Sequence, residues 1–274
     1  AFVRAIASMC ENEPFRLFSG GRVEDLQAIT PQVLKAEHDD LLAHAPMDLF
    51  VVGDVDPEEV EAAVQDAFRL PERAIAPLAG NTLVSAPAHP RRIEERVEVN
   101  QGQLVMGLRT PVTYASDDHY AMLMYNGILG GFAHSKLFMH VRERESLAYS
   151  TRSRYDAHKG LLMIQAGIDV ENYQRALEVI EEQLEAMVKG EISDAELAST
   201  QAMLLNTYRE AYDSPGALVN LAFESLAAGR ERSIEELVAA IPRVTKEDIC
   251  RVAGQIRLDT VYFLRDKEKV AAHA

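Results

Sequence analysis

The side chains best suited to bind a catalytic metal are a neighbouring glutamate and histidine, Glu37 and His38. A zinc peptidase needs two histidines on one helical face beside a carboxylate that acts as general base, as in HExxH or its inversion HxxEH. Neither motif occurs, because Leu34 stands where HxxEH needs its first histidine. We expect the Glu37–His38 pair to be solvated. The sequence therefore predicts no metal site and no residue that is catalytic in isolation.

Other catalytic signatures are also missing. His38 and His44 are six residues apart, as are His134 and His140, and this spacing directs each pair to different faces of a helix. No GxSxG motif is present, and the pair Gly130–Gly131 fits neither a Walker loop nor GxGxxG. We interpret the two glycines as the end of one helix and the start of the next.

Residues 130–150, GGFAHSKLFMHVRERESLAYS, combine a Gly-rich turn, a small residue, a Leu-Phe pair, an arginine and a Leu-x-Tyr at fixed spacing. This pattern resembles the second-lobe signature of the pitrilysin, insulinase and mitochondrial-processing-peptidase family of zinc metallopeptidases. The matching residues are Gly130, Gly131, Ser135, Leu137, Phe138, Arg142, Leu147 and Tyr149.

The resemblance implies a substrate-binding role for Arg142 and Tyr149. In the family, this arginine and tyrosine reach the zinc held by the first lobe, bind the substrate carbonyl and stabilise the oxyanion; Gly130, Gly131 and Ser135 would form the supporting loop. A guanidinium and a phenol suit that role because both are donors that can meet a developing negative charge. The alternative is an ion pair between the arginine and a neighbouring glutamate on a solvated helix end, with the tyrosine packed on a sheet.

Two further segments extend the resemblance. Residues 21–60 look like the tail of the family's first lobe, in which a helix leads into a strand that ends in Gly-Asp and then into another helix. Residues 10–21, CENEPFRLFSGG, look like the bacterial YmfF-type branch, whose members lack the zinc motif and are encoded beside an intact YmfH-type homologue. The metal-bearing helices would precede residue 1, and we expect the chain to begin inside a longer protein.

Helices and strands must position these residues. Thr30–Pro31 and Asp56–Pro57 are N-cap signals followed by a first-turn proline. Ser116, Asp117 and Asp118 predict the cap of another helix. Helical spacing predicts helices over 2–10, 23–29, 30–45, 56–70, 117–128, 132–144, 171–188, 194–211, 215–228, 234–241 and 245–256. Apolar or alternating runs predict strands over 47–54, 91–99, 101–109, 146–155, 161–168 and 259–266.

An internal repeat organises these elements. Residues 23–54 and 234–266 each contain a short helix, a second helix and a strand in the same order. Leu26 matches Leu237, Thr30 matches Thr245, and Asp48 matches Asp259. Between the two copies, residues 71–90 contain four prolines and no periodicity, which is typical of a linker.

Composition limits the possible partners. The net charge of -15 disfavours nucleic acid and anionic membranes, which need clustered Lys and Arg. No apolar run reaches the roughly 18 residues of a membrane span. Cys10 and Cys250 are far apart and outside any CxxC, so we expect buried, reduced thiols and a cytoplasmic protein.

We therefore predict an α+β fold of duplicated processing-peptidase-like lobes, related to the LuxS-like metallohydrolases, each with helices on one face of a mainly antiparallel sheet. Residues 1–75 would be the remnant of the first lobe, 76–90 the linker, and 91–274 a complete second lobe. The predicted function is the zinc-less part of such a peptidase, inactive alone, which works with zinc on a homologous partner lobe or subunit and with an extended peptide substrate. Two alternatives are a pure interaction scaffold without a proteolytic role and a fragment of an active zinc endopeptidase whose HxxEH lies upstream. A second copy of the chain, forming a homodimer, is a further candidate partner.

Overall fold

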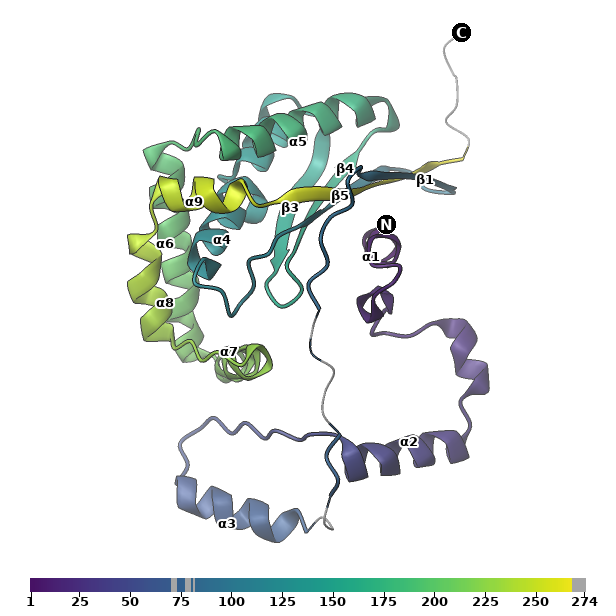
Figure 1. The fold of residues 1–274 in the computed structure, drawn as a ribbon, viewed down its shortest axis with the longest axis vertical. Helices are drawn as coiled ribbons and strands as arrows, with labels where there is room; N and C mark the ends of the chain where they lie inside the picture. Colours follow the sequence, from purple (N-terminus) through teal and green to yellow (C-terminus); the bar gives the residue numbers. More distant parts are fainter. Residues whose placement is uncertain (70–72, 77–79, 81, 268–274) are drawn as a thin grey trace.

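A five-stranded sheet lies at the centre of the computed structural model, which describes all residues except 70–72, 77–79, 81 and 268–274 (Figure 1). The strand order is β1-β5-β2-β4-β3; β1 runs parallel to β5, and the other neighbours are antiparallel. The fold is thus α+β with a mainly antiparallel sheet, as predicted. The strands are β1 (Arg91–Val97), β2 (Gly102–Arg109), β3 (Ala148–Asp156), β4 (Leu161–Ile168) and β5 (Arg257–Asp266).

The central strands are buried on both faces. In β2, Leu104 and Met106 belong to the core under the helices, whereas Val105 belongs to a smaller core on the other face. Alternation of this kind follows from the two-residue period of a strand, and burial on both faces explains the nearly continuous apolar sequence of β2 and β4.

One face of the sheet carries a helical layer (Figure 1). The side chains of Ser193, Ser214, Ser233 and Thr245 each accept a hydrogen bond from a backbone N–H in the first turn of the following helix, as N-cap residues do. The helices are α4 (His119–Asn126), α5 (Tyr173–Val188), α6 (Asp194–Glu210), α7 (Pro215–Ala228), α8 (Ile234–Ala240) and α9 (Lys246–Ala253). Short 3₁₀ turns occur at Val170–Asn172, Ala211–Asp213 and Ile241–Arg243.

The other face of the sheet is covered by α1 (Phe2–Met9). Its Ala5 and Met9 are buried against Val105, Met163 and Tyr262. This contact places a helix on the second face of the sheet, and it joins residues predicted to belong to the first lobe to the sheet predicted for the second. The reason is that the apolar residues on the second face of β2, β4 and β5 also need to be buried.

The segment between α4 and β3 differs in detail from the prediction. The predicted cap residues do not cap α4: the side chain of Asp118 makes no capping hydrogen bond and instead forms an ion pair with Arg251. Beyond α4 the helix widens into a π-helical turn that ends at the two glycines. The two π-helical turns are Gly127–Gly131 and Phe138–Arg144.

The first copy of the repeat lacks its strand. Residues 47–54 form no strand in the described structure, although the matching residues of the second copy form β5. A strand requires a neighbour to bond its N–H and C=O groups, and no described strand lies beside this segment. The preceding elements are 3₁₀ turns at Pro14–Arg16 and Val23–Ala28, then α2 (Pro31–His44); α3 (Pro57–Ala67) follows.

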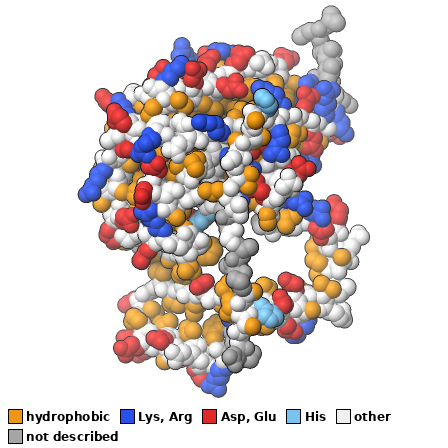
Figure 2. Space-filling view, in the orientation of Figure 1, with side chains coloured by type: hydrophobic (Ala, Val, Ile, Leu, Met, Phe, Trp, Pro, Cys, Tyr) orange, Lys and Arg blue, Asp and Glu red, His pale blue; other side chains and the backbone are white. Residues whose placement is uncertain are grey.

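Burial distinguishes the two copies at matched positions. Leu237 of the second copy is buried and its counterpart Leu26 is 63% exposed. Neither α2 nor α3 contains a buried residue. Figure 2 shows hydrophobic side chains at the surface of this lower part of the molecule. The exposed hydrophobic residues of this segment include Leu34, Leu41, Met47, Leu49, Val51 and Val52.

Some predictions concern regions that the structure describes only in part. Residues 77–79 and 81 of the predicted linker lie outside the described residues, and 82–90 contain no helix or strand. Both cysteines are free thiols; Cys10 is buried, but Cys250 is only partly buried, because it lies on α9 beside the Val188 carbonyl at the end of α5. Within the described part of the chain, no helix has the length and apolar character needed to cross a bilayer.

Candidate functional site

Arg142 lies near the end of the π-helical turn Phe138–Arg144, and its side chain is 44% exposed. The guanidinium carbon lies 4.7 Å from the centre of the Phe138 ring, and Nε lies 3.7 Å from a carboxylate oxygen of Glu143. Both contacts are weak at an exposed position. The guanidinium therefore keeps donors that a ligand can use.

Tyr149 is the second residue of β3, and it is 64% exposed. Its hydroxyl donates a hydrogen bond to Asp169 at 3.1 Å. This hydrogen bond, followed by the charge of Asp169, raises the pKa of the Tyr149 phenol above its ordinary value. The phenol is thus a neutral donor, and it must leave Asp169 before it can donate to a substrate.

Arg142 and Tyr149 flank the junction between the π-helical turn and the edge strand. The backbone N–H of Leu147 donates to the carbonyl of Val141 at 2.9 Å, which brings the two sides of the junction together. The helical turn ends at Arg144, where the helix predicted over 132–144 also ends, and Glu145 is its C-cap. Among the described residues no hydrogen bond joins Arg142 to Tyr149, so neighbouring segments rather than a direct contact hold them.

The predicted supporting residues are buried or tightly packed. A Cβ atom at Gly130 would lie 2.6 Å from the backbone nitrogen of Ser153 on β3, so this glycine permits the helix to approach the strand. At Gly131 the nearest atom to a Cβ would be the Asn126 carbonyl oxygen, 3.1 Å away. Ser135 is buried, and its hydroxyl has no hydrogen-bond partner among the described residues. Gly130 and Ser135 are thus packed inside the protein, and Gly131 is exposed.

The described histidines are dispersed. His38 lies beside Asp39 on the exposed face of α2, and Nδ1 of His44 contacts Asp40 at 2.9 Å. Nε2 of His134 contacts Thr200 at 3.0 Å. In the described part of the chain, no group of three or more His, Cys, Asp or Glu side chains is arranged to hold a metal ion. The described residues therefore do not fit the zinc site of a peptidase.

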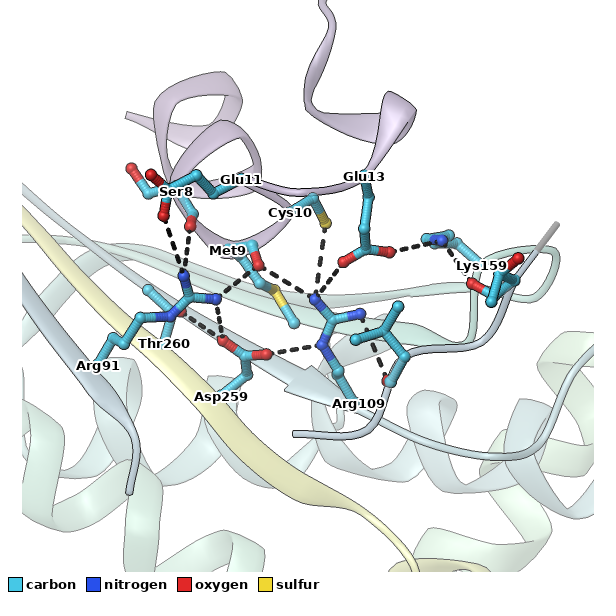
Figure 3. A network of polar contacts seen from close by, with 12 residues as sticks. Ser8, Met9, Cys10, Glu11, Glu13, Arg91, Arg109, Lys159, Asp259 and Thr260 are labelled. Carbon is cyan, nitrogen blue, oxygen red and sulfur yellow. Dashed lines mark hydrogen bonds and ion pairs between the residues drawn. The ribbon is translucent and has the colours of Figure 1, made fainter. Parts of the chain in front are cut away.

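A buried polar network, which the sequence analysis missed, joins the segment after α1 to the sheet (Figure 3). Glu13 forms two ion pairs of 2.6 Å, one with Arg109 at the end of β2 and one with Lys159 in the β3–β4 turn. Burial alone raises the pKa of Glu13, but the hydrogen bonds from Arg109 and Lys159 outweigh it and hold the pKa below its ordinary value. Glu13 is therefore charged near neutral pH.

The other half of the network is centred on Asp259 at the start of β5. Its carboxylate accepts from Arg109 at 2.6 Å and from Arg91 at 2.9 Å. Arg91 also donates to the carbonyls of Ser8 and Met9. Charged residues inside otherwise apolar strands were the available sequence signal, because such residues are buried only when they are paired.

A second buried cluster surrounds His119 at the start of α4. Burial, with a smaller effect from Arg232, lowers the pKa of His119 to about 3, so the imidazole is neutral. Arg232 is also buried and lies over the Tyr114 and Tyr120 rings. A cavity of about 480 Å³ adjoins Tyr114 and His119. Among the described residues, no hydrogen bond, ion pair or ring contact connects this cluster to Arg142 or Tyr149.

Comparison with known proteins gives one family. Residues 28–204 match the profile of the family described as the peptidase M16 inactive domain. The chain is 38% identical over 266 residues to the probable inactive metalloprotease YmfF of Bacillus subtilis, covering 97% of this chain and 62% of that protein. It is 27% identical over 269 residues to an uncharacterized zinc protease of Streptomyces coelicolor, with 92% and 58% covered. The chain thus spans about three fifths of the length of these relatives.

Solved structures give the same fold. A conserved protein from Enterococcus faecalis superposes with a TM-score of 0.91 at 30% identity, over 98% of this chain and 64% of that one. The peptidase M16 inactive domain from Pseudomonas fluorescens gives a TM-score of 0.80 at 19% identity, over 100% of this chain and 66% of that one. The second likeness concerns the fold alone.

Proposed function

Because this chain belongs to the peptidase M16 inactive-domain family, we propose that it is the zinc-less part of a processing-peptidase-like metallopeptidase. In this proposal it supplies Arg142 and Tyr149 to a zinc site on a homologous lobe or subunit. The supporting observation is that both side chains are exposed at one junction beside an edge strand, and that Arg142 has only weak partners there.

In this proposal the chain donates hydrogen bonds to the substrate and transfers no proton. The Arg142 guanidinium is permanently charged and donates to the substrate carbonyl, and the Tyr149 phenol donates to the oxyanion. The raised pKa of Tyr149 keeps its proton in place at neutral pH. Removal of one such donor typically lowers the rate constant about 10²- to 10³-fold. A peptide would be held as an additional strand beside β3, through main-chain hydrogen bonds.

The test measures peptide hydrolysis by a zinc-bearing homologue of the family, alone and mixed with this full chain. We expect the chain to raise the rate, and Arg142→Ala and Tyr149→Phe each to remove at least about tenfold of that gain. Arg209→Ala and Tyr212→Phe are the matched controls, because Arg209, on α6, and Tyr212 are exposed residues away from the junction. Circular dichroism checks that every variant is folded. Equal gains from all five proteins would reject the assigned roles.

A scaffold function is the second candidate, and one observation favours it. The Tyr149 hydroxyl is already bound to Asp169, and the Arg142 guanidinium already lies over Phe138. A scaffold would bind its partner equally well with Arg142→Ala and Tyr149→Phe and would change no peptidase rate.

Reading the gene upstream of Ala1 for HxxEH tests the third possibility, that the parent protein is an active zinc endopeptidase.

A further inference from the structure

β3 is the last strand of the sheet, so one of its edges has no strand partner among the described residues. Its alternate residues face opposite sides. Ser153 is buried toward the helical layer, whereas Ser150, Arg152 and Arg154 are exposed on the opposite side. α1 covers β2 and β5 on that side and leaves these three residues of β3 exposed. An edge of this kind can accept another strand.

The exposed row of β3 is positively charged in a chain with 43 acidic and 28 basic side chains. Arg154 makes no hydrogen bond or ion pair with a described residue, and Arg152 donates only to the neutral amide of Gln165 at 3.0 Å. Arg152 lies opposite Gln165 and Arg154 opposite Met163 in the ladder with β4. No carboxylate of β2 or β4 competes for the two guanidinium groups, because neither strand contains an acidic residue.

We infer that the outer edge of β3 selects an extended peptide with acidic side chains at alternate positions. Residues two apart on a strand point to the same face, about 6 to 7 Å apart. A peptide strand paired with β3 would therefore place every second side chain beside Ser150, Arg152 and Arg154. Directly opposed side chains of opposite charge attract at this separation. The inference rests on the proposed peptide-holding function and specifies the class of peptide.

Arginines on an edge strand also have a simpler use, which is to prevent edge-to-edge aggregation. The two uses make different predictions. Protection against aggregation needs charge alone and gives no preference among soluble peptides. Selection of an acidic partner gives a preference that depends on these two positions and that decreases with salt, because screening weakens exposed ion pairs.

The experiment measures binding of labelled nine-residue peptides to the full chain by fluorescence anisotropy, without any zinc-bearing homologue. Three peptides share a Thr-rich sequence and carry Glu, Gln or Lys at alternate positions. We expect the Glu peptide to bind about 2- to 30-fold more tightly than the Gln peptide, which corresponds to two opposed charge pairs. The Lys peptide should bind least tightly. Raising the ionic strength from about 0.05 to 0.5 M should reduce the preference.

The variant Arg152→Glu/Arg154→Glu should reverse the order and favour the Lys peptide. The control Arg92→Glu/Arg243→Glu changes the net charge equally at exposed positions on β1 and after α8, and should keep the Glu preference. Equal binding of the three peptides to the unmutated chain would overturn the inference. Loss of the Glu preference in the control variant would also overturn it. If a variant misfolds, the three peptides on the unmutated chain still test the inference. Because no hydrolysis is measured, this result is separate from the roles of Arg142 and Tyr149.

Discussion

At the scale of single residues, Glu13 determines how the amino-terminal segment is held on the sheet. It is the buried carboxylate of that segment, and it faces Arg109 and Lys159, which are also buried. Arg109 keeps Asp259 as a partner if Glu13 is lost, and Lys159 keeps the Thr82 carbonyl. Loss of Glu13 would still leave one excess buried positive charge, which is costly.

We expect Glu13→Gln to lower the free energy of unfolding by about 3 kcal/mol at neutral pH, because breaking a buried pair typically costs this much. The measurement is urea unfolding followed by circular dichroism. Glu37→Gln, on the exposed surface of α2, is the matched control and should change stability by less than about 0.5 kcal/mol. A loss in Glu13→Gln no larger than in the control would contradict the assignment.

The same ion pairs predict a pH dependence. The folded pKa of Glu13 lies below its unfolded value of about 4.3. Its contribution is therefore complete above the unfolded pKa and is lost as the pH falls through the folded pKa. The stability difference between the unmutated chain and Glu13→Gln should be constant from about pH 7 to 5 and should shrink below about pH 4. A difference that grows on acidification would have the wrong sign.

At the scale of elements, the approach of a π-helical turn to β3 positions the candidate site. Gly130 makes this approach possible, because a Cβ atom would lie 2.6 Å from the Ser153 backbone nitrogen and 2.9 Å from Cδ1 of Leu137. A strand backbone cannot move aside as a flexible side chain can. Tyr149 lies on β3, which Gly130 meets here, and Arg142 lies on the next π-helical turn, Phe138–Arg144, whose preceding residue Leu137 also packs at this contact.

Gly130→Ala should destabilise the protein by about 1 to 3 kcal/mol through overpacking. Gly216→Ala in α7 is the control, because no atom lies within 4 Å of the added Cβ there, and alanine should stabilise the helix by up to about 1 kcal/mol. Thermal unfolding measures both. Relative to the unmutated chain, we expect a lower melting temperature for Gly130→Ala and an equal or higher one for Gly216→Ala. The reverse order would show that the close contact at Gly130 is absent.

At the scale of the whole molecule, the chain divides into a packed part and an exposed part (Figure 1). The sheet, α1 and the helical layer enclose the two cores, whereas α2 and α3 lie away from the sheet and contain no buried residue. Helices gain most of their stability from packing, so isolated helices of this length are marginal in water.

Amide hydrogen exchange should show this division in the 274-residue chain. We expect the amides of α2 and α3 to exchange with little protection, and those of β2 and β4 to exchange last, at rates set by global unfolding. Mass spectrometry of peptic fragments measures the exchange of these helices and strands in one experiment. Protection in α2 equal to that in α9, its counterpart in the repeat, would show that α2 is packed in solution.

Much of the fold of residues 91–267 followed from sequence alone. Alternating and apolar runs identified β1 to β5, and helical spacing identified α6, α7 and α9, whose N-caps are Ser193, Ser214 and Thr245. These signals are local, because side-chain periodicity and capping depend on residues within one turn or strand. The pattern around Arg142 and Tyr149 also gave the family, which residues 28–204 confirm. The roles of these two residues remain predictions.

Tertiary structure decided what local signals could not. Residues 47–54 and β5 have similar sequences, yet only β5 has neighbouring strands and becomes a strand. The packing of α1 on the sheet and the pairing of Glu13 with Arg109 and Lys159 join residues about 100 or more positions apart. Strand pairing and charge burial both depend on which distant groups come together in space, and the spacing of residues along one chain does not specify that.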